Sequence, residues 1–181
     1  MKSQINSTNQ NENNGNTKKN SYGKIYADIE FLNSQIDLVC HATEDKAKIL
    51  DSIFQVLLIP QEKFEETEYE GHWGNKILKL TATINKKESL SLIKRILESI
   101  SFVERDALLN NLENHIDEKG NLFLRVDKQK TCKNKISLTE NEGIKIKFKP
   151  NKNKIIELKK SNRIENEIYL LYRRLIQFSE K

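Results

Sequence analysis

The clearest alternation of apolar and polar positions lies in residues 117–130, DEKGNLFLRVDKQK. A polar turn that contains a glycine comes first, and the side chains then alternate with a period of two. One face is aliphatic and is made of Leu122, Leu124 and Val126. The other face carries Phe123 and Arg125. The pattern predicts a strand that is buried on one side.

The free side of this predicted strand shows an aromatic ring beside an arginine, and the segment then runs into Lys128, Gln129 and Lys130. A flat ring, a guanidinium and nearby lysines suit a ribose-phosphate chain with unstacked bases. An ordinary sheet strand with solvated ends is the alternative interpretation, because most such strands are only scaffold.

Similar patterns predict the elements that precede this strand. Residues 25–42 alternate in their second half, which indicates a strand in one or two pieces. Thr43 is expected to cap a helix that Pro60 stops. The buried stripe of that helix is expected to consist of Ile49, Leu50, Ile53, Phe54 and Leu57. Strands over 63–70 and 76–84 flank a glycine-bounded turn and predict a hairpin.

Two helices and a second hairpin complete the predicted body. The first helix covers residues 86–100, and the second begins at a capping box formed by Ser101 and Glu104. Residues 136–138 and 144–148 are expected to pair as a hairpin.

This order of elements predicts an α+β domain with a mainly antiparallel sheet and helices packed on one face. The other face would be open, and an open sheet face is a common platform for RNA. The side chains expected on it are Lys79, Thr81, Phe123, Arg125 and Lys147.

The two ends of the chain differ from this body. Residues 1–23 include seven asparagines and are expected to form a disordered leader. Residues 24–150 form the predicted RNA-binding-like domain, and 151–181 a basic linker followed by an amphipathic helix. That helix, over 162–178, has a heptad seam of Ile164, Ile168, Leu171, Leu175 and Phe178. The seam is expected to pack on the body or on a partner, which includes a second copy of the chain.

Composition excludes several classes of protein. The chain has 181 residues, of which 36% are hydrophobic and 31% charged, and no apolar run approaches the ~20 residues that span a bilayer. The N-terminus lacks the apolar core of a secretory signal. Cys40 and Cys132 lie far apart, which fits a reducing cytosol better than a disulfide framework.

Charge is divided unevenly along the chain. Residues 1–123 hold 15 Lys and Arg against 19 Asp and Glu, whereas residues 124–181 hold 16 against 7. The basic part includes Lys145 and Lys147 on one face of a predicted strand. Such a cluster attracts polyanions, among which RNA is the commonest in a cytosol. Anionic lipid and an acidic protein face are the alternatives.

Candidate catalytic residues are few. The sequence has no spacing typical of a metal site and no glycine-rich phosphate-binding loop, so no metal and no cofactor are predicted. A nuclease built on His41, Asp45 and His72 is an alternative whose geometry the sequence does not define. Trp73 lies between two turn glycines, where it either stacks on a base or caps the core, and Asn75 either caps the turn or bonds a base.

Three segments, taken together, resemble a known family. They are Cys40–Asp45 (CHATED), Glu70–Asn75 (EGHWGN) and Asp117–Gln129 (DEKGNLFLRVDKQ). Over residues 34–150 the chain resembles archaeal proteins described as predicted exosome subunits or RNA-binding proteins. That family is similar in fold to the large-subunit ribosomal protein that binds 5S rRNA. The resemblance implies RNA binding linked to RNA processing or degradation.

The sequence therefore predicts a cytoplasmic, non-catalytic RNA-binding protein, with exosome proteins as further partners. The residues expected to contact RNA are His72, Trp73, Asn75, Lys79, Phe123, Arg125, Lys128, Gln129, Lys130, Lys145 and Lys147. An assembly factor that uses the helix at 162–178 is the alternative, and a metal-assisted nuclease is a third hypothesis.

Overall fold

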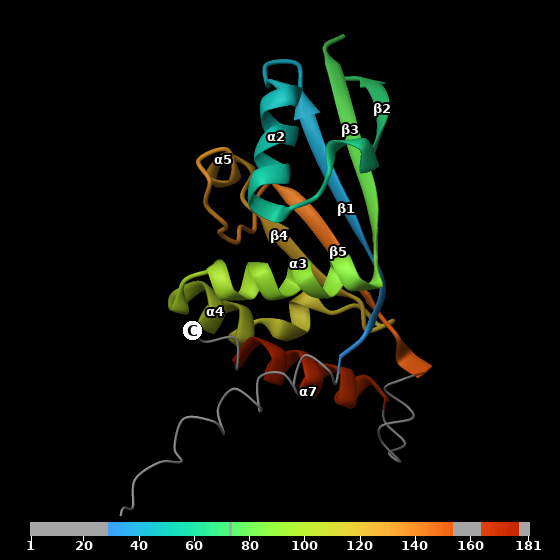
Figure 1. Cartoon of the computed structure of the whole chain (residues 1–181), viewed down its shortest axis with the longest axis vertical. Coiled ribbons are helices and arrows are strands. Elements are labelled where there is room, and N and C mark those ends of the chain that lie inside the picture. Colours follow the sequence, from blue (N-terminus) through green and yellow to red (C-terminus); the bar gives the residue numbers. More distant parts are fainter. Residues whose placement is uncertain (1–28, 73, 154–163, 178–181) are drawn as a thin grey trace, which may run out of the picture.

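The computed structural model describes residues 29–72, 74–153 and 164–177 (Figure 1). Five strands form one antiparallel sheet in the order β2-β3-β1-β5-β4. The strands are β1 Phe31–His41, β2 Phe64–Glu70, β3 Lys76–Asn85, β4 Leu122–Val126 and β5 Ile144–Pro150. The helices are α2 Lys46–Leu57, α3 Lys86–Ser99, α4 Phe102–Asn110, α5 Lys128–Thr131 and α7 Ile164–Gln177, with 3-10 turns η1 Gln61–Lys63 and η2 Leu112–His115. The predicted α+β class is confirmed.

Helices cover one face of the sheet and leave the other open. Figure 1 shows α2 and α3 on the same side of the strands, with α4 and α7 beyond α3. Alternate residues of β1, β3, β4 and β5 are buried beneath these helices, including Ile36, Leu80, Leu124 and Ile146. The predicted alternation of β4 is thus confirmed, because its three aliphatic residues are all buried.

Helix α2 differs from its prediction at both ends. Asp45, not Thr43, is the N-cap, because its carboxylate accepts the backbone N–H of Lys48 at 3.1 Å. The helix ends before Pro60, at Leu58, which adopts a left-handed conformation. Phe54 was expected in the buried stripe but is 49% exposed.

The second predicted hairpin is wrong. Strand β5 lies between β1 and β4 and pairs with both of them, so its neighbours come from distant parts of the chain. From the segment 136–138, Leu138 forms an isolated bridge with Val126 on the outer edge of β4. The short helix α5 was also not predicted, and it begins because Asp127 accepts the N–H of Lys130.

The C-terminal helix α7 packs on the body. Of its predicted heptad seam, Ile168, Leu171 and Leu175 are buried. Tyr172 stacks on Phe31 with ring centroids 6.4 Å apart and donates its hydroxyl proton to the carbonyl of the turn before β4 at 3.1 Å. The predicted leader, 1–23, and residues 154–163 lie outside the described part of the chain. Among the described residues, no helix is long and apolar enough to cross a membrane.

Candidate functional site

The open face of the sheet brings together side chains from all five strands. Strand registers place Glu65, Thr81, Asp37, Lys145 and Arg125 in one row that runs from β2 to β4. A neighbouring row contains Thr83, Gln35, Lys147 and Phe123. The predicted open-face residues therefore share one face, as the alternation of each strand requires.

The cations of this face gather at one edge. Strands β4 and β5 contribute four of them, which are Arg125, Lys145, Lys147 and Lys149. At the opposite edge, only Glu65 of the acidic strand β2 lies on the open face, because the other glutamates of that strand share the parity of the buried residues. We call the β4–β5 part the basic half. A polyanion on the open face is attracted to the basic half.

Arg125 is held in a fixed orientation on the basic half. Its Nη1 donates to the backbone carbonyls of Glu140 at 2.8 Å and Asn141 at 3.1 Å. Both acceptors are neutral carbonyls. Lys145 lies directly opposite Arg125 in the register, so two cations stand side by side at this row.

Phe123 is half-buried on the same strand and lies beside a lysine. The Nζ atom of Lys147 is 5.3 Å from the centroid of the Phe123 ring, which is a cation–π distance. The backbone carbonyl of Phe123 accepts a hydrogen bond from Nδ1 of His115 at 2.9 Å. The aromatic ring and the cations that the sequence predicted together do meet on one surface.

Asp37 is the acid at the centre of the open face. Its Oδ1 accepts the hydroxyl of Thr81 at 3.0 Å, and Nε2 of Gln35 donates to its Oδ2 at 3.0 Å. Lys79 approaches the same carboxylate at 3.9 Å. A hollow of about 250 Å³ opens here, between Asp37, Lys79, Arg125 and Lys145. Lys79 thus lies on the predicted face but beside a carboxylate.

Lys128 does not lie on the open face as an exposed phosphate contact. Its side chain is only 7% exposed, and its Nζ lies 2.6 Å from Glu44 Oε2 and 3.2 Å from Glu142 Oε1. The ammonium also donates to the Val39 carbonyl at 2.8 Å. The expectation for Lys128 is corrected, because the long stem of this lysine carries its charge inward to carboxylates.

The same cluster joins two of the three sequence motifs. His41 Nε2 lies 2.9 Å from Glu142 Oε1, and the His41 backbone N–H donates to Glu44 at 3.0 Å. Burial alone would raise the pKa of both carboxyls, but hydrogen bonds from Lys128 and from His41 hold each below its usual value. Burial alone would lower the pKa of Lys128, yet its carboxylate partners raise it. We call this group, His41, Glu44, Lys128 and Glu142, the motif cluster.

Gln129 and Lys130 also lie away from the basic half. Nε2 of Gln129 is 3.4 Å from a Glu44 carboxylate oxygen. Nζ of Lys130 donates to Ser137 at 2.8 Å and lines a hollow on the helical side, together with Arg95. The lysines that follow β4 therefore divide between two sides of the molecule.

The turn between β2 and β3 carries other predicted contacts. His72 and Asn75 are exposed there, and the Asn75 carbonyl accepts the N–H of Gly71 at 2.8 Å. Trp73 lies outside the described residues. This turn joins the acidic edge strand, so it is separated from the basic half by β3 and β1.

The residues of the nuclease hypothesis have structural contacts of their own. Asp45 caps α2, and His41 pairs with Glu142. Burial raises the pKa of the neighbouring thiol of Cys40, which favours its protonated form. Within the described residues there is no group of three or more His, Cys, Asp and Glu side chains that could hold a metal ion.

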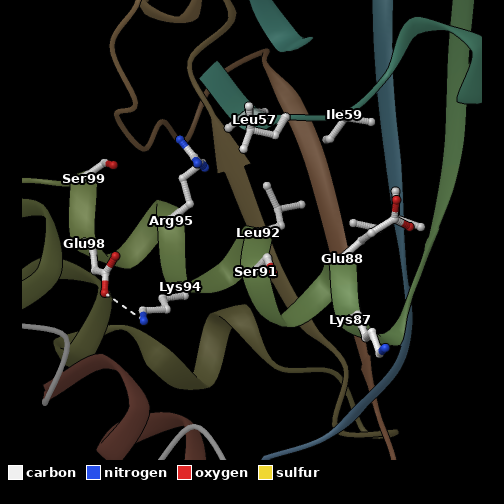
Figure 2. Close-up of a pocket in the computed structure, with 12 residues that line it drawn as sticks. Leu57, Ile59, Lys87, Glu88, Ser91, Leu92, Lys94, Arg95, Glu98 and Ser99 are labelled. Atoms are coloured by element: carbon white, nitrogen blue, oxygen red, sulfur yellow. Dashed lines mark ion pairs between the residues drawn. The ribbon is translucent and has the colours of Figure 1, made fainter. Parts of the chain in front are cut away.

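A separate hollow of about 490 Å³ lies on the helical side, between the end of α2 and helix α3 (Figure 2). Its walls mix apolar side chains such as Leu92 with charges of both signs. Lys94 pairs with Glu98 at 3.8 Å, as the dashed line in Figure 2 shows, and Glu88 pairs with Lys63. The basic half carries four cations from β4 and β5, so it is the better candidate for binding a polyanion.

Comparison with known proteins gives a consistent result. A family model described as RNA binding matches residues 33–150. The RNA-binding protein PAB1135 of Pyrococcus abyssi is 32% identical over 126 residues, which cover 64% of this chain and 79% of that protein.

Solved structures show the same fold. Mth689, a DUF54 protein from Methanothermobacter thermautotrophicus, superposes with a TM-score of 0.61 at 24% identity, over 81% of this chain and 98% of its own. SSO0741 from Sulfolobus solfataricus gives a TM-score of 0.57 at 31% identity, over 78% of this chain and 98% of its own.

Proposed function

The chain belongs to the family described as RNA binding, and from that premise we propose that it binds single-stranded RNA on its basic half without cleaving it. The observation that carries this proposal is the pairing across β4 and β5, where Arg125 lies opposite Lys145 and Phe123 opposite Lys147. A stacking ring, a planar guanidinium and two ammonium groups are the groups that hold unpaired RNA.

The two kinds of side chain have different tasks. Lys145, Lys147 and Lys149 contact phosphates, and their alternation along β5 suits a backbone that runs along this strand. Phe123 and Arg125 offer flat surfaces to unstacked bases. Since the cations of the open face lie on β4 and β5, while Asp37 and Glu65 lie on β1 and β2, the strand of RNA is held on the basic half.

Salt dependence of binding tests this proposal. Anisotropy of a labelled RNA oligomer of about ten nucleotides is measured between about 50 and 200 mM salt. Lys145→Ala and Lys147→Ala are each expected to reduce the slope of log K against log salt by about 0.7, the value per phosphate contact of a single strand. Lys87→Ala removes the same charge from the exposed helical side and should leave the slope unchanged.

Two outcomes would overturn the proposal. One is the absence of binding by the wild-type protein at the lowest salt concentration. The other is an equal effect of Lys87→Ala and Lys145→Ala, which would show that only net charge matters. The RNA recovered after incubation with Mg²⁺ is expected to be intact, and cleavage that persists through repurification would contradict a non-catalytic role.

The wider setting is also a proposal. The three motifs resemble those of predicted archaeal exosome subunits, so we assign the protein to the cytoplasm as an accessory of exosome-linked RNA processing or degradation, with a fold related to that of the 5S-rRNA-binding ribosomal protein. Affinity purification followed by identification of bound RNA and proteins tests this assignment. A set of partners without RNA-processing proteins would contradict it.

A protein-interaction function for the C-terminal helix has weaker support. An assembly factor or a homo-oligomer that uses residues 164–178 needs an available seam. Ile168, Leu171 and Leu175 of that seam are buried against the same chain. Self-association would be favoured if light scattering gave a dimer mass for the whole chain and a monomer mass for the Leu170→Glu variant, which changes the exposed side of α7. Two residues of the metal-assisted nuclease hypothesis have structural contacts, because Asp45 caps α2 and His41 pairs with Glu142.

A further inference from the structure

A hollow of about 380 Å³ lies beside the outer edge of β4, next to the basic half. Its lining includes Phe123, Arg125 and Lys145 from the sheet, and Asn111, Asn114 and His115 from the segment that follows α4. The same cations and ring that form the basic half thus also border a concave site. The amides and the imidazole have no part in the function proposed above.

The hollow exists because the outer edge of β4 is covered only in part. The Arg125 carbonyl accepts the N–H of Thr139 at 3.0 Å, and the Phe123 carbonyl accepts His115 Nδ1 at 2.9 Å. The hollow lies by these two contacts, and its lining includes His115 of η2 and the segment around Thr139. The edge strand itself forms part of the lining, through Phe123, Leu124 and Arg125.

The hydrogen bond of His115 defines which of its ring nitrogens is free. A carbonyl only accepts hydrogen bonds, so Nδ1 must carry the proton that it donates to Phe123. In the neutral imidazole, Nε2 is then an acceptor on the side of the ring away from the strand.

Asn111 is in a similar state. Its Nδ2 donates to the Ala107 carbonyl at 3.1 Å, which leaves Oδ1 as an acceptor. His115 and Asn111 both line the hollow, and both have used a donor on the backbone of the protein, so each retains an acceptor. The ligand that fits them best brings hydrogen-bond donors.

Flat surfaces and positive charge complete the site. The Phe123 ring and the Arg125 guanidinium both line the hollow, and the guanidinium is held by two backbone carbonyls. Planar groups of this kind stack on nucleobases. Lys145 lies at the boundary between the hollow and the open face, where the phosphate of an inserted nucleotide would remain.

We infer that this hollow is a nucleobase pocket, into which one base of the bound RNA strand turns away from its neighbours. The base stacks on Phe123 or Arg125, and its edge donates to His115 Nε2 and Asn111 Oδ1. An exocyclic amino group supplies such a donor in adenine, cytosine and guanine. Uracil lacks an amino group and has only its N3–H as a donor on this edge, so it satisfies only one of the two acceptors and the pocket discriminates against it. This inference rests on the proposed function and adds a base preference to it.

The test compares oligomers that differ at one position. Anisotropy is measured at fixed salt with a uridine oligomer of about ten nucleotides, with the same oligomer carrying one central adenosine, and with one carrying a central abasic site. The adenosine oligomer is expected to bind about tenfold more tightly than the other two. Asn111→Ala and His115→Ala should reduce this ratio to about one, while affinity for the uridine oligomer changes little.

Matched variants separate the pocket from the basic half. Asn110→Ala changes the exposed neighbour of Asn111. The amide of Asn110 donates to Asp106 outside the hollow, so this variant should keep the preference for the adenosine oligomer. Lys147→Ala should weaken the binding of all three oligomers by a similar factor. Since the first comparison uses the wild-type protein, its result does not depend on how well any variant folds.

The outcomes distinguish the two proposals. Equal wild-type binding of the adenosine and uridine oligomers, with Lys147→Ala still weakening both, overturns the pocket and leaves the proposed function standing. No binding of any oligomer overturns both. Adenosine monophosphate alone should bind far more weakly than the oligomer, and equal affinity would contradict a base that belongs to an RNA strand.

Discussion

Lys128→Met provides a sharp test of the motif cluster, because it removes the ammonium at its centre and keeps an apolar stem of similar length. Nζ of Lys128 contacts Glu44, Glu142 and the Val39 carbonyl at 2.6, 3.2 and 2.8 Å. Glu142 is 56% exposed, so it returns to water and contributes little to the loss. Glu44 is 17% exposed and would remain as a carboxylate that is only partly compensated.

The magnitude follows from these three contacts. Breaking a buried ion pair costs about 3–5 kcal/mol, and one hydrogen bond to a charged group contributes about 1.5–3 kcal/mol. Glu44 keeps the hydrogen bond from the His41 N–H, which places the loss at the lower end. We expect about 3 kcal/mol of stability to be lost, which lowers Tm by about 6–12 °C for a chain of this size.

Chemical denaturation measures this loss directly. Lys133→Met changes an exposed lysine of the adjacent turn and should alter stability by less than about 0.5 kcal/mol. The double variant Lys128→Met with Glu44→Gln removes both charges, so it should be more stable than the sum of the two single effects by at least about 1 kcal/mol. A Lys128→Met protein as stable as the wild type, or strict additivity in the double variant, would refute a buried ion pair.

The same variant addresses the earlier expectation that Lys128 contacts a phosphate. Below its melting temperature, Lys128→Met should keep the wild-type salt slope for RNA, because the ammonium points into the protein and not onto the open face. A slope reduced as much as by Lys145→Ala would show that the cluster opens to receive RNA.

Three further predictions concern stability. Burial alone would raise the pKa of Glu104, but hydrogen bonds from hydroxyls and backbone N–H groups lower it to about 2. The ionised Glu104 contributes about 2–3 kcal/mol to the stability of the fold above pH 4.5, and this contribution is lost as the pH falls toward 2. In the Glu104→Gln variant, the denaturation midpoint should therefore depend less on pH across this range than it does in the wild type. Gly120→Ala should lower the free energy of unfolding by about 1–2 kcal/mol, because φ is +74° and an added Cβ would lie 2.6 Å from a side chain of α7. Asn85→Ala should cost about 1 kcal/mol in the same assay, because it removes the capping box of α3.

Much of the fold was predictable because alternation is a local signal. The side of a strand on which Phe123, Arg125 or Lys147 lies follows from its parity with buried neighbours, so the open face was correct before any pairing was known. Strand order is different. Nothing in residues 136–148 indicates that β5 inserts between β1 and β4, because β1 lies far away in the sequence.

Side chains whose contacts depend on distant elements were the ones that sequence reasoning missed. The stem of Lys128 reaches carboxylates in the segments before α2 and before β5, and no local pattern marks Glu44 and Glu142 as its partners. Asn111 and His115 lie in an ordinary polar helix end. They line a hollow only because the outer edge of β4 lies nearby. The capping residue Asp45 could have been found, since Asp is as good an N-cap as Thr43 or better.

The charge pattern and the hollow favour the same path for an RNA strand. Asp37 lies between Thr81 and Lys145 in its row, so a phosphate that crossed from β5 toward β3 would meet this carboxylate and then that of Glu65 on β2. A strand that follows β5 toward the outer edge of β4 meets the cations Lys145 and Arg125 and then the hollow beside Phe123, which Glu140 also lines. In the proposed mode of binding, Asp37 would act without any contact to RNA, because it would keep the strand on the half of the sheet where a base can enter the pocket.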